Sequence, residues 1–459
     1  MEEFGTRSER KFRRAPVGDE LTTTQLKATH VQTTVQPPSV SQLVEWTRRD
    51  LRERLGTCSI HRAAHWFRTR GGDMPLRLGT FNVWGLPEAF ADDVSSRMRG
   101  LASRLPGLDL DVLFIQEAWT EEVRDTLREA ALASNFEVAG GSSSSGGLMI
   151  FSRLPIRSAN FESFRFRGDP ERLSQGEFLG GKGFQTVVLD GSDGPLPVIN
   201  THLHARYRRS RPQLNSAVRT AQLLQVIGAL KDLDGTAVVG GDFNCIHADL
   251  EYRIFSGLTR STELGDGQSF PTLSKTNYYK RYRRGADKRI DYLFVRPGHN
   301  VECRSTGAAM LFAKPERIRR RDRSLSDHYG FRASFESRST VTNSNSSRPR
   351  LFDPEVFDLA RNLLRIGREE ADRRERAHFR SAGSWAMAAV AAASIRRHPA
   401  LDRRCFLRSS AGALAVFALM PTIGYGTLAR LDSDYKRDAF DDAHEILVQL
   451  EGRPDRDTA

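Results

Sequence analysis

VINTHLHARY, residues 198–207, begins like a buried strand and ends in polar side chains that a core does not need. Val198 and Ile199 are apolar and β-branched, which favours a strand. His202 and His204 follow, two positions apart, and side chains at that spacing share one face of a strand. If the strand has already ended, His204 lies at its rim instead. The pattern predicts a strand that presents an imidazole at its end, held in place by a rigid scaffold.

The same ending recurs along the chain. Five other β-rich segments place an amide, a carboxylate or an imidazole beside an apolar run: Asn82 after LGTF, Glu117 after LFIQ, Asp242 and Asn244 with VVGG, Asp291 after KRI, and Asp327 and His328 after SLS. Taken singly, each has a structural explanation, such as a turn cap, an Asx turn or a salt bridge at the rim. Six such positions together indicate a functional site.

These segments belong to one region of alternating strand and helix signals. Eight β-rich runs and several helix-like segments fill residues 76–335, and NSAVRTAQLLQVIGALKDL keeps apolar residues near helical spacing. That many strands, interleaved with helices, predict a single α/β domain with a sizeable core, which we place at residues 74–335.

The composition narrows the classes of partner. The chain has 459 residues, with 39% hydrophobic and 27% charged, a formal net charge of +12 and a pI of about 9.8. Such a balance favours nucleic acid, an acidic membrane face or a phosphate-bearing substrate. Four widely spaced cysteines without a C-x-x-C argue against a disulfide framework or a zinc site and suit a reducing compartment.

The polar set suits metal-assisted hydrolysis of a phosphate ester. Mg²⁺ prefers oxygen ligands and keeps several waters, so Glu117 with the amide of Asn82 can suffice, and Mn²⁺ is an alternative ion. A general base needs a pKa near neutrality and a carboxylate that fixes its tautomer, which His328 and Asp291 offer. Asp242, with Asn244 two positions later, can orient the attacking water.

The motifs TFNVWGLP, FIQEAW, GLMIFSR, NTHLHARY, GGDFNC, RIDYLF and LSDHYGF resemble the endonuclease/exonuclease/phosphatase superfamily, in that family's order, over residues 76–335. The resemblance implies a four-layer α/β (α+β) sandwich of two packed mixed β-sheets flanked by helices. It also implies the following roles: Glu117 as the main metal ligand assisted by Asn82, His202 on the scissile phosphate, Asp242 and Asn244 positioning water and phosphate, Asp291 orienting the base His328, and Asp327 in the shell of the metal or the histidine.

Within that superfamily, HLHARY, FNVWGLP and GGKGF are most similar to the neutral sphingomyelinases. This resemblance implies phospholipase-C-type cleavage of sphingomyelin to ceramide and phosphocholine. Lys182, His204 and Tyr207 would then serve the substrate, although His204 can equally have a supporting or turn role. The inositol-polyphosphate phosphatase pattern, with Trp before Gly-Asp and a later Cys-Asp-Arg, is not matched by VVGGDFN and DKRIDYL.

A DNase or abasic-site endonuclease is the main alternative. NYYKRYRRGADKR, residues 277–289, interleaves tyrosines with basic residues, which suits a phosphate backbone and stacked bases. The same loop suits an anionic lipid interface, and RYRRSR and ERIRRRDR are ambiguous in the same way. A solvated surface or a non-catalytic binding protein on this fold are further alternatives.

The segments on either side of the domain differ from it in amino-acid composition. We expect a disordered basic arm at residues 1–73 without a secretory signal, a Ser/Asn-rich linker at 336–350, and a helical, Arg-rich tail at 351–459. The tail contains a candidate membrane segment at 409–429, preceded by two arginines. A C-terminal anchor that leaves the catalytic domain in the cytoplasm is favoured over a twin-arginine export signal or a buried helix.

Overall fold

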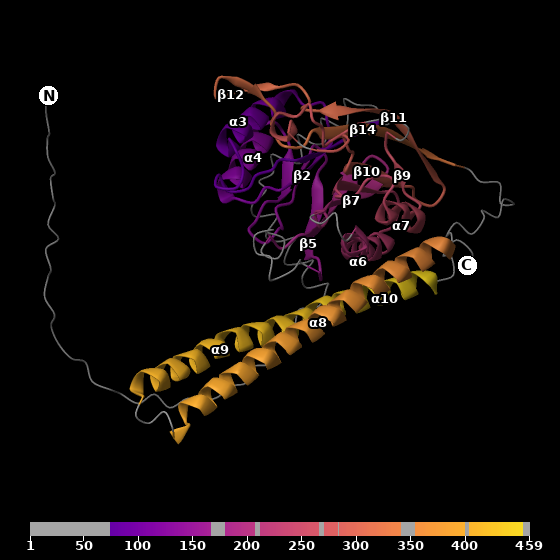
Figure 1. Cartoon of the computed structure of the whole chain (residues 1–459). Helices are drawn as coiled ribbons and strands as arrows, with labels where there is room; N and C mark the ends of the chain where they lie inside the picture. Colours follow the sequence, from indigo (N-terminus) through magenta and orange to yellow (C-terminus); the bar gives the residue numbers. More distant parts are fainter. Residues whose placement is uncertain are drawn as a thin grey trace, which may run out of the picture. The chain divides into compact units, whose positions relative to one another are not determined.

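A computed structural model describes residues 74–166, 180–206, 212–265, 270–282, 284–340, 354–399 and 404–452. Two six-stranded mixed sheets pack face to face and carry helices on their outer sides, as Figure 1 shows. This confirms the four-layer sandwich. The predicted arm at 1–73 lies outside the described residues, as does residue 207 of the opening motif.

The first sheet has the strand order β11-β14-β1-β2-β4-β3. Its strands are β11 (Val301–Leu311), β14 (Gly330–Ser339), β1 (Leu76–Asn82), β2 (Val112–Gln116), β4 (Met149–Ser152) and β3 (Glu137–Gly140). The helices α3 (Val94–Arg104) and α4 (Glu121–Ala133) pack on its outer face through a cluster that includes Met98, Leu101, Val123 and Leu127.

The second sheet has the order β5-β6-β7-β8-β10-β9. Its strands are β5 (Ile156–Ser163), β6 (Gly183–Gly191), β7 (Gly194–His202), β8 (Ala237–Asp242), β10 (Asp291–Arg296) and β9 (Thr262–Glu263), with α6 (Pro212–Lys231) and α7 (Leu250–Thr259) outside. The short elements are η1 (Leu105–Gly107), η3 (Tyr278–Lys280) and the hairpin of β12 (Glu316–Ile318) and β13 (Arg321–Arg323).

The core between the sheets explains the glycines of the VVGGD segment. Val238, Leu293 and Phe114 are fully buried there. A Cβ on Gly240 would lie 2.7 Å from the Leu293 side chain and 3.2 Å from that of Phe114. Gly240 therefore permits the close approach of the two sheets beneath the predicted site.

Strand register brings the polar positions to one edge of the sandwich. β1 and β2 are parallel, as are β7 and β8, so their carboxyl ends lie together. His202 pairs with Asp242 in register, and Asp242 pairs with Asp291 across the antiparallel β8 and β10. Asp291 begins its strand and His328 precedes β14, but both strands run antiparallel to their neighbours, and so they reach the same edge.

The described part of the C-terminal region is helical. α8 (Pro354–Arg396) and α9 (Cys405–Leu431) lie side by side in Figure 1, followed by the π-helical segment η5 (Asp432–Arg437) and α10 (Asp438–Glu451). Val356, Leu363 and Phe440 join the core cluster of α6 and the second sheet. The strand β14 continues to Ser339, four residues into the segment 336–350 that we expected to be a linker, because these residues pair with β11.

The apolar residues near the α8–α9 connection are exposed. They include Val390 and Ile395 of α8, and Phe406, Phe417 and Met420 of α9. Among the described residues, one helical stretch, Cys405–Glu451, is long and apolar enough to cross a membrane, and 11% of its most apolar window is buried. The candidate segment 409–429 lies within α9, which is continuous through Pro421.

Candidate active site

Side chains from six segments converge at the shared edge of the two sheets. Two groups of residues hold potential ligand atoms within 4.8 Å of one another: Glu117, His202 and Asp242 form one group, and Asp242, Asp291 and His328 form the other. Asp242 belongs to both groups. The sequence therefore predicted the members of one continuous cluster, although they are up to 211 positions apart, from Glu117 to His328.

Asn82 holds the two carboxylates at the centre of the cluster. Its Nδ2 donates hydrogen bonds to Glu117 Oε1 at 2.8 Å and to Asp242 Oδ2 at 3.0 Å. Its Oδ1 accepts from the backbone N–H of Trp84 at 3.0 Å. In this arrangement the amide nitrogen faces the carboxylates, so Asn82 orients the candidate metal ligands.

His202 faces the same pair of carboxylates. Its Nε2 lies 3.7 Å from Glu117 Oε1 and 3.6 Å from Asp242 Oδ2, and the side chain is almost fully buried. The ring of Trp119 lies 6.4 Å from the imidazole, centre to centre. β7 ends at His202, which is therefore the last residue to follow the alternation of the strand.

His328 and Asp291 form the predicted imidazole–carboxylate pair. His328 Nδ1 lies 3.0 Å from Asp291 Oδ2, and His328 Nε2 lies 4.0 Å from Asp242 Oδ2. Burial alone would lower the pKa of His328, but Asp291, followed by Asp327 and Asp242, raises it to about 10. The surrounding carboxylates therefore favour the protonated form of this imidazole.

Burial and neighbouring negative charges raise the pKa values of the two central carboxylates. Burial raises the pKa of Glu117, and the charge of Asp327 adds to the effect. Burial and the charge of Asp291 raise the pKa of Asp242 to about 7, against the opposing effect of His328. Asp291 Oδ1 is buried without a hydrogen-bond partner among the described residues. A divalent cation would compensate this crowded negative charge, and the oxygen-rich donor set fits a hard ion.

Asn244 and Lys182 meet at one carbonyl. Asn244 Nδ2 donates to the backbone oxygen of Leu203 at 3.0 Å, and Lys182 Nζ donates to the same oxygen at 3.1 Å. The backbone N–H of Asn244 donates to Asp242 Oδ1 at 2.9 Å, which is the Asx turn considered from the sequence. Lys182 is buried, and its charge lowers the pKa values of Glu117 and Asp242.

Two other predicted residues have contacts that lie outside the ligand groups. The contacts of His204 include an edge-on packing against Phe166 at 6.2 Å and a hydrogen bond from its backbone N–H to Gln222 Oε1 of α6 at 2.8 Å. Asp327 accepts from Lys280 Nζ at 2.7 Å and belongs to neither ligand group. Burial opposes ionisation of Asp327, but His328 and Lys280 outweigh it and lower its pKa.

Sequence reasoning missed the buried arginine that supports the site. Arg97 of α3 is fully buried, and its guanidinium donates to the carbonyl oxygens of Asp92, Val83, Leu325 and Trp84 at 2.7–3.1 Å. It therefore ties the segment that follows β1 to the segment that precedes His328. The RMRG motif carries no signal that separates this arginine from surface arginines.

Backbone strain concentrates at the site. Glu117 has φ of 61°, Asn244 has 51° and Trp84 has 49°, although none of them is a glycine. A positive φ costs conformational free energy in any residue with a side chain. Such strained residues cluster at functional sites, where the surrounding structure holds them in place. The strained residues include a candidate metal ligand and the residue that contacts both Asp242 and Leu203.

With this geometry established, comparison with known proteins identifies the family. The model of the Endonuclease/Exonuclease/phosphatase family matches residues 79–328, just over half of the chain. The chain belongs to this family. The matched range contains every residue of the two ligand groups.

Curated relatives are similar at low identity. The chain is 26% identical to a putative neutral sphingomyelinase of Drosophila melanogaster over 265 residues, which cover 56% of this chain and 59% of the relative. It is 25% identical to an inositol phosphosphingolipids phospholipase C of Schizosaccharomyces pombe over 293 residues, covering 55% and 66%. It is 30% identical to human sphingomyelin phosphodiesterase 2 over 181 residues, covering 38% and 42%. The match thus spans less than two thirds of each relative.

Proposed function

We propose that this protein is a Mg²⁺-dependent phosphodiesterase that cleaves phosphosphingolipids, with sphingomyelin as the first substrate to test. The single observation behind the proposal is the convergence of Glu117, His202, Asp242, Asp291 and His328 at one buried edge of the sandwich. The family and the names of the relatives point to the same chemistry. Cleavage on the headgroup side of ceramide would be of the phospholipase C type.

Glu117 would hold the metal, and Asn82 would keep the carboxylates of Glu117 and Asp242 in position through its two hydrogen bonds. A bound Mg²⁺ ion supplies positive charge to the phosphate oxygens. Mn²⁺ offers similar oxygen coordination and is the natural substitute.

Side chains of the cluster would orient the phosphate and the attacking water and would accept the proton of the water. His202 Nε2 points at the carboxylate pair and would hydrogen-bond a non-bridging phosphate oxygen that enters there. Asp242 and Asn244 would position the attacking water. Asp291 fixes the ring of His328 through Nδ1, which leaves Nε2 directed into the site. His328 would accept the proton of the water once its own pKa falls, and added positive charge in the carboxylate cluster lowers that pKa.

The remaining predicted residues would act around this centre. Lys182 lies close enough to affect both central carboxylates and would reach the phosphate after leaving the Leu203 carbonyl. Asp327 would act through Lys280 and through the pKa of His328. His204 and Tyr207 remain proposed substrate contacts, and Tyr207 lies outside the described residues.

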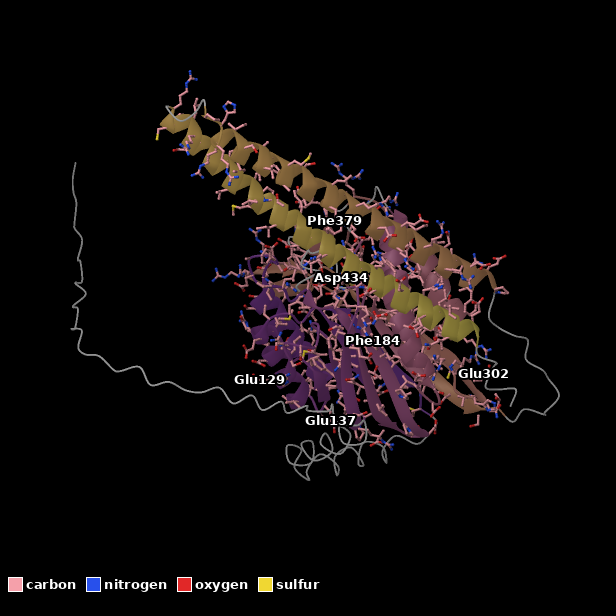
Figure 2. All side chains as sticks on the ribbon, turned by 90° about the horizontal axis from the view of Figure 1, so that it is seen from below. Glu129, Glu137, Phe184, Glu302, Phe379 and Asp434 are labelled. Atoms are coloured by element: carbon pink, nitrogen blue, oxygen red, sulfur yellow. The ribbon has the colours of Figure 1, made fainter. Side chains whose placement is uncertain are left out.

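A membrane surface is the proposed location of the substrate. The exposed apolar side chains of α8 and α9 near their connection would insert into lipid and hold the catalytic domain at a membrane surface, which we propose is the cytoplasmic one. Phe379 of α8, labelled in Figure 2, is another exposed apolar side chain of this helix. Flotation of the full chain with sphingomyelin vesicles, compared with a variant in which Phe406, Phe417 and Met420 become serine, tests this location.

The activity test uses the full chain with sphingomyelin in mixed micelles and, in parallel, supercoiled plasmid. We expect phosphocholine release in Mg²⁺ that EDTA abolishes and that His328→Ala and Glu117→Gln reduce to background. Glu121→Gln, a change of the same kind on exposed α4, is the matched control. Intact sphingolipid would contradict the proposal.

A nuclease is the second candidate, favoured by the loop that carries Tyr278, Lys280, Arg281 and Tyr282. Arg281 packs on Tyr278 at 4.0 Å and on Tyr282 at 4.9 Å, and Tyr282 is 84% exposed. Such a surface can stack bases and contact phosphates. Nicked plasmid with untouched lipid would favour this candidate and leave the metal site as proposed.

A further inference from the structure

A cavity lies beside the candidate active site, lined by residues of three segments, 84–93, 278–282 and 319–323. Its volume is about 530 Å³, within the range of sites for small organic groups. Trp84, whose N–H donates to Asn82, forms one wall. Tyr279 packs on Trp84 at 5.3 Å and precedes Lys280, the ion-pair partner of Asp327. Two residues of the cavity, Trp84 and Tyr279, thus lie close in the sequence to Asn82 and to the partner of Asp327, both of which belong to the candidate active site.

The lining combines aromatic walls with polar groups of both signs. Arg281, Arg319 and Arg323 supply guanidinium donors, while Glu88 and Asp92 supply carboxylate acceptors. Asp93, at the base, binds Arg319 at 3.2 Å, pairs with Arg323 and accepts from the Tyr279 hydroxyl at 2.9 Å. Binding of a hydrocarbon chain in this cavity is unfavourable, because it would remove water from the polar groups of the lining without offering them hydrogen-bond partners. The cavity suits a polar headgroup.

Arginines of the lining already cover two of its tyrosine rings. Arg281 lies over Tyr278 at 4.0 Å and over Tyr282 at 4.9 Å, and Arg323 lies over Tyr278 at 5.0 Å. A trimethylammonium group binds by placing its charge on open aromatic faces. Here it would meet guanidinium groups on those faces and be repelled, so the cavity is a poor site for choline.

The turn of the β12–β13 hairpin has a strained backbone, and its first residue, Arg319, lines the cavity. Ile318 pairs with Arg321, which leaves Arg319 and Arg320 as a two-residue loop, and both have positive φ, 46° and 65°. Loops of this kind normally contain Asn-Gly or Gly-Gly. Trp84 and Asp93, which also line the cavity, have φ of 49° and 59°. Three lining residues thus hold a costly backbone conformation, which is typical of functional sites.

We infer that this cavity binds the headgroup of the substrate and selects a ring-shaped polyhydroxyl group of the inositol kind over choline. The inference rests on the proposed phosphosphingolipid hydrolysis and specifies its headgroup. Hydroxyl groups both donate and accept, so one polyol ring can satisfy the guanidinium groups and the carboxylates together. A small cation can satisfy only the carboxylates.

The test compares two sphingolipids with the same ceramide, one carrying phosphoinositol and one phosphocholine, in mixed micelles with Mg²⁺ and the full chain. Bis(p-nitrophenyl) phosphate, which has no headgroup, reports on the catalytic centre alone. Arg319→Gln removes one donor from the cavity, and Arg320→Gln makes the same charge change at the neighbouring turn residue, which does not line the cavity.

We expect the wild type to have the higher kcat/KM for the phosphoinositol lipid. Arg319→Gln should lower that kcat/KM about tenfold, as expected for the loss of one charged hydrogen bond. The same variant should change hydrolysis of bis(p-nitrophenyl) phosphate less than twofold, and Arg320→Gln should leave all three rates near wild type. A wild-type preference for phosphocholine, or equal effects of the two variants, would overturn the assignment of the cavity. Hydrolysis of bis(p-nitrophenyl) phosphate with neither lipid cleaved would instead overturn the proposed function itself.

Discussion

Replacing Asp291 by Asn tests whether this carboxylate controls the proton affinity of the site. The change removes the charge 3.0 Å from His328 Nδ1 and keeps the size of the side chain. The pKa of His328 is about 10, against an ordinary 6.5, and this difference corresponds to a net stabilisation of the protonated ring on the order of 5 kcal/mol, after burial has opposed the attraction of the carboxylates. Because Asp291 is the largest of the raising influences, we expect Asp291→Asn to lower the pKa of His328 by about one to three units.

The sign of the effect on stability follows from the direction of the shift. A histidine whose pKa is higher in the folded state stabilises the fold fully below its ordinary pKa of 6.5, and this stabilisation is lost as the pH rises through about 10. Asp291→Asn should therefore lower the free energy of unfolding more at pH 6 than at pH 10. Removing Asp291 also removes a charge that raises the pKa of Asp242, so that pKa should fall below about 7.

Two measurements on the metal-free protein check these expectations. NMR titration of the histidine ring protons gives the pKa of His328 in the wild type and in Asp291→Asn, and urea unfolding at both pH values gives the free energies. With Mg²⁺ and substrate, kcat should fall about 10²- to 10⁴-fold, the range for loss of a positioned acid–base group. Asp125→Asn, on exposed α4, is the matched control. An unchanged pKa of His328, or a kcat within threefold of wild type, would refute the role assigned to the pair.

Three further predictions concern the metal, the supporting arginine and the second histidine. Mg²⁺ should raise the Tm of the wild type but not of Glu117→Gln, because binding to the folded state alone stabilises it, and differential scanning calorimetry with and without EDTA checks this. Arg97→Ala should cost about 3–5 kcal/mol in urea unfolding, because buried carbonyls lose a charged donor, whereas Arg99→Ala on the exposed side of α3 should cost less than about 0.5 kcal/mol. His204→Ala should lower kcat/KM, because His204 is a proposed substrate contact, whereas a lower Tm with kcat/KM within threefold of wild type would assign His204 to packing against Phe166 alone.

The sequence predicted the cluster because each member follows or begins an apolar strand. Asn82, Glu117, His202 and Asp242 close parallel strands, whose ends lie together for a topological reason that needs no knowledge of side-chain contacts. The Asx turn of Asp242 and Asn244 was also predictable, because it depends on residues two positions apart. The pattern could not predict the position of His204, because its contacts are with residues distant in the sequence, such as Gln222 of α6.

Ion pairs between distant segments could not be predicted in this way. Asp93 pairs with Arg323, which is 230 positions away, and no local signal marks either residue among the many charged side chains of the chain. The pairing of Asp327 with Lys280 has the same origin. Asp327 lies outside the two ligand groups and pairs with Lys280.

The positions of strain connect the candidate metal centre to the neighbouring cavity. Glu117 and Asn244 adopt positive φ at the centre, and Trp84, Asp93 and Arg319 do so around the cavity. A side chain in this conformation is retained only when the surrounding contacts over-determine it. Arg97 provides such contacts, because its hydrogen bond to the Trp84 carbonyl and its packing on the Trp84 ring fix the segment shared by both sites. A change in Arg97 should therefore disturb phosphate positioning and headgroup selection together, whereas a change in Arg319 should disturb headgroup selection alone.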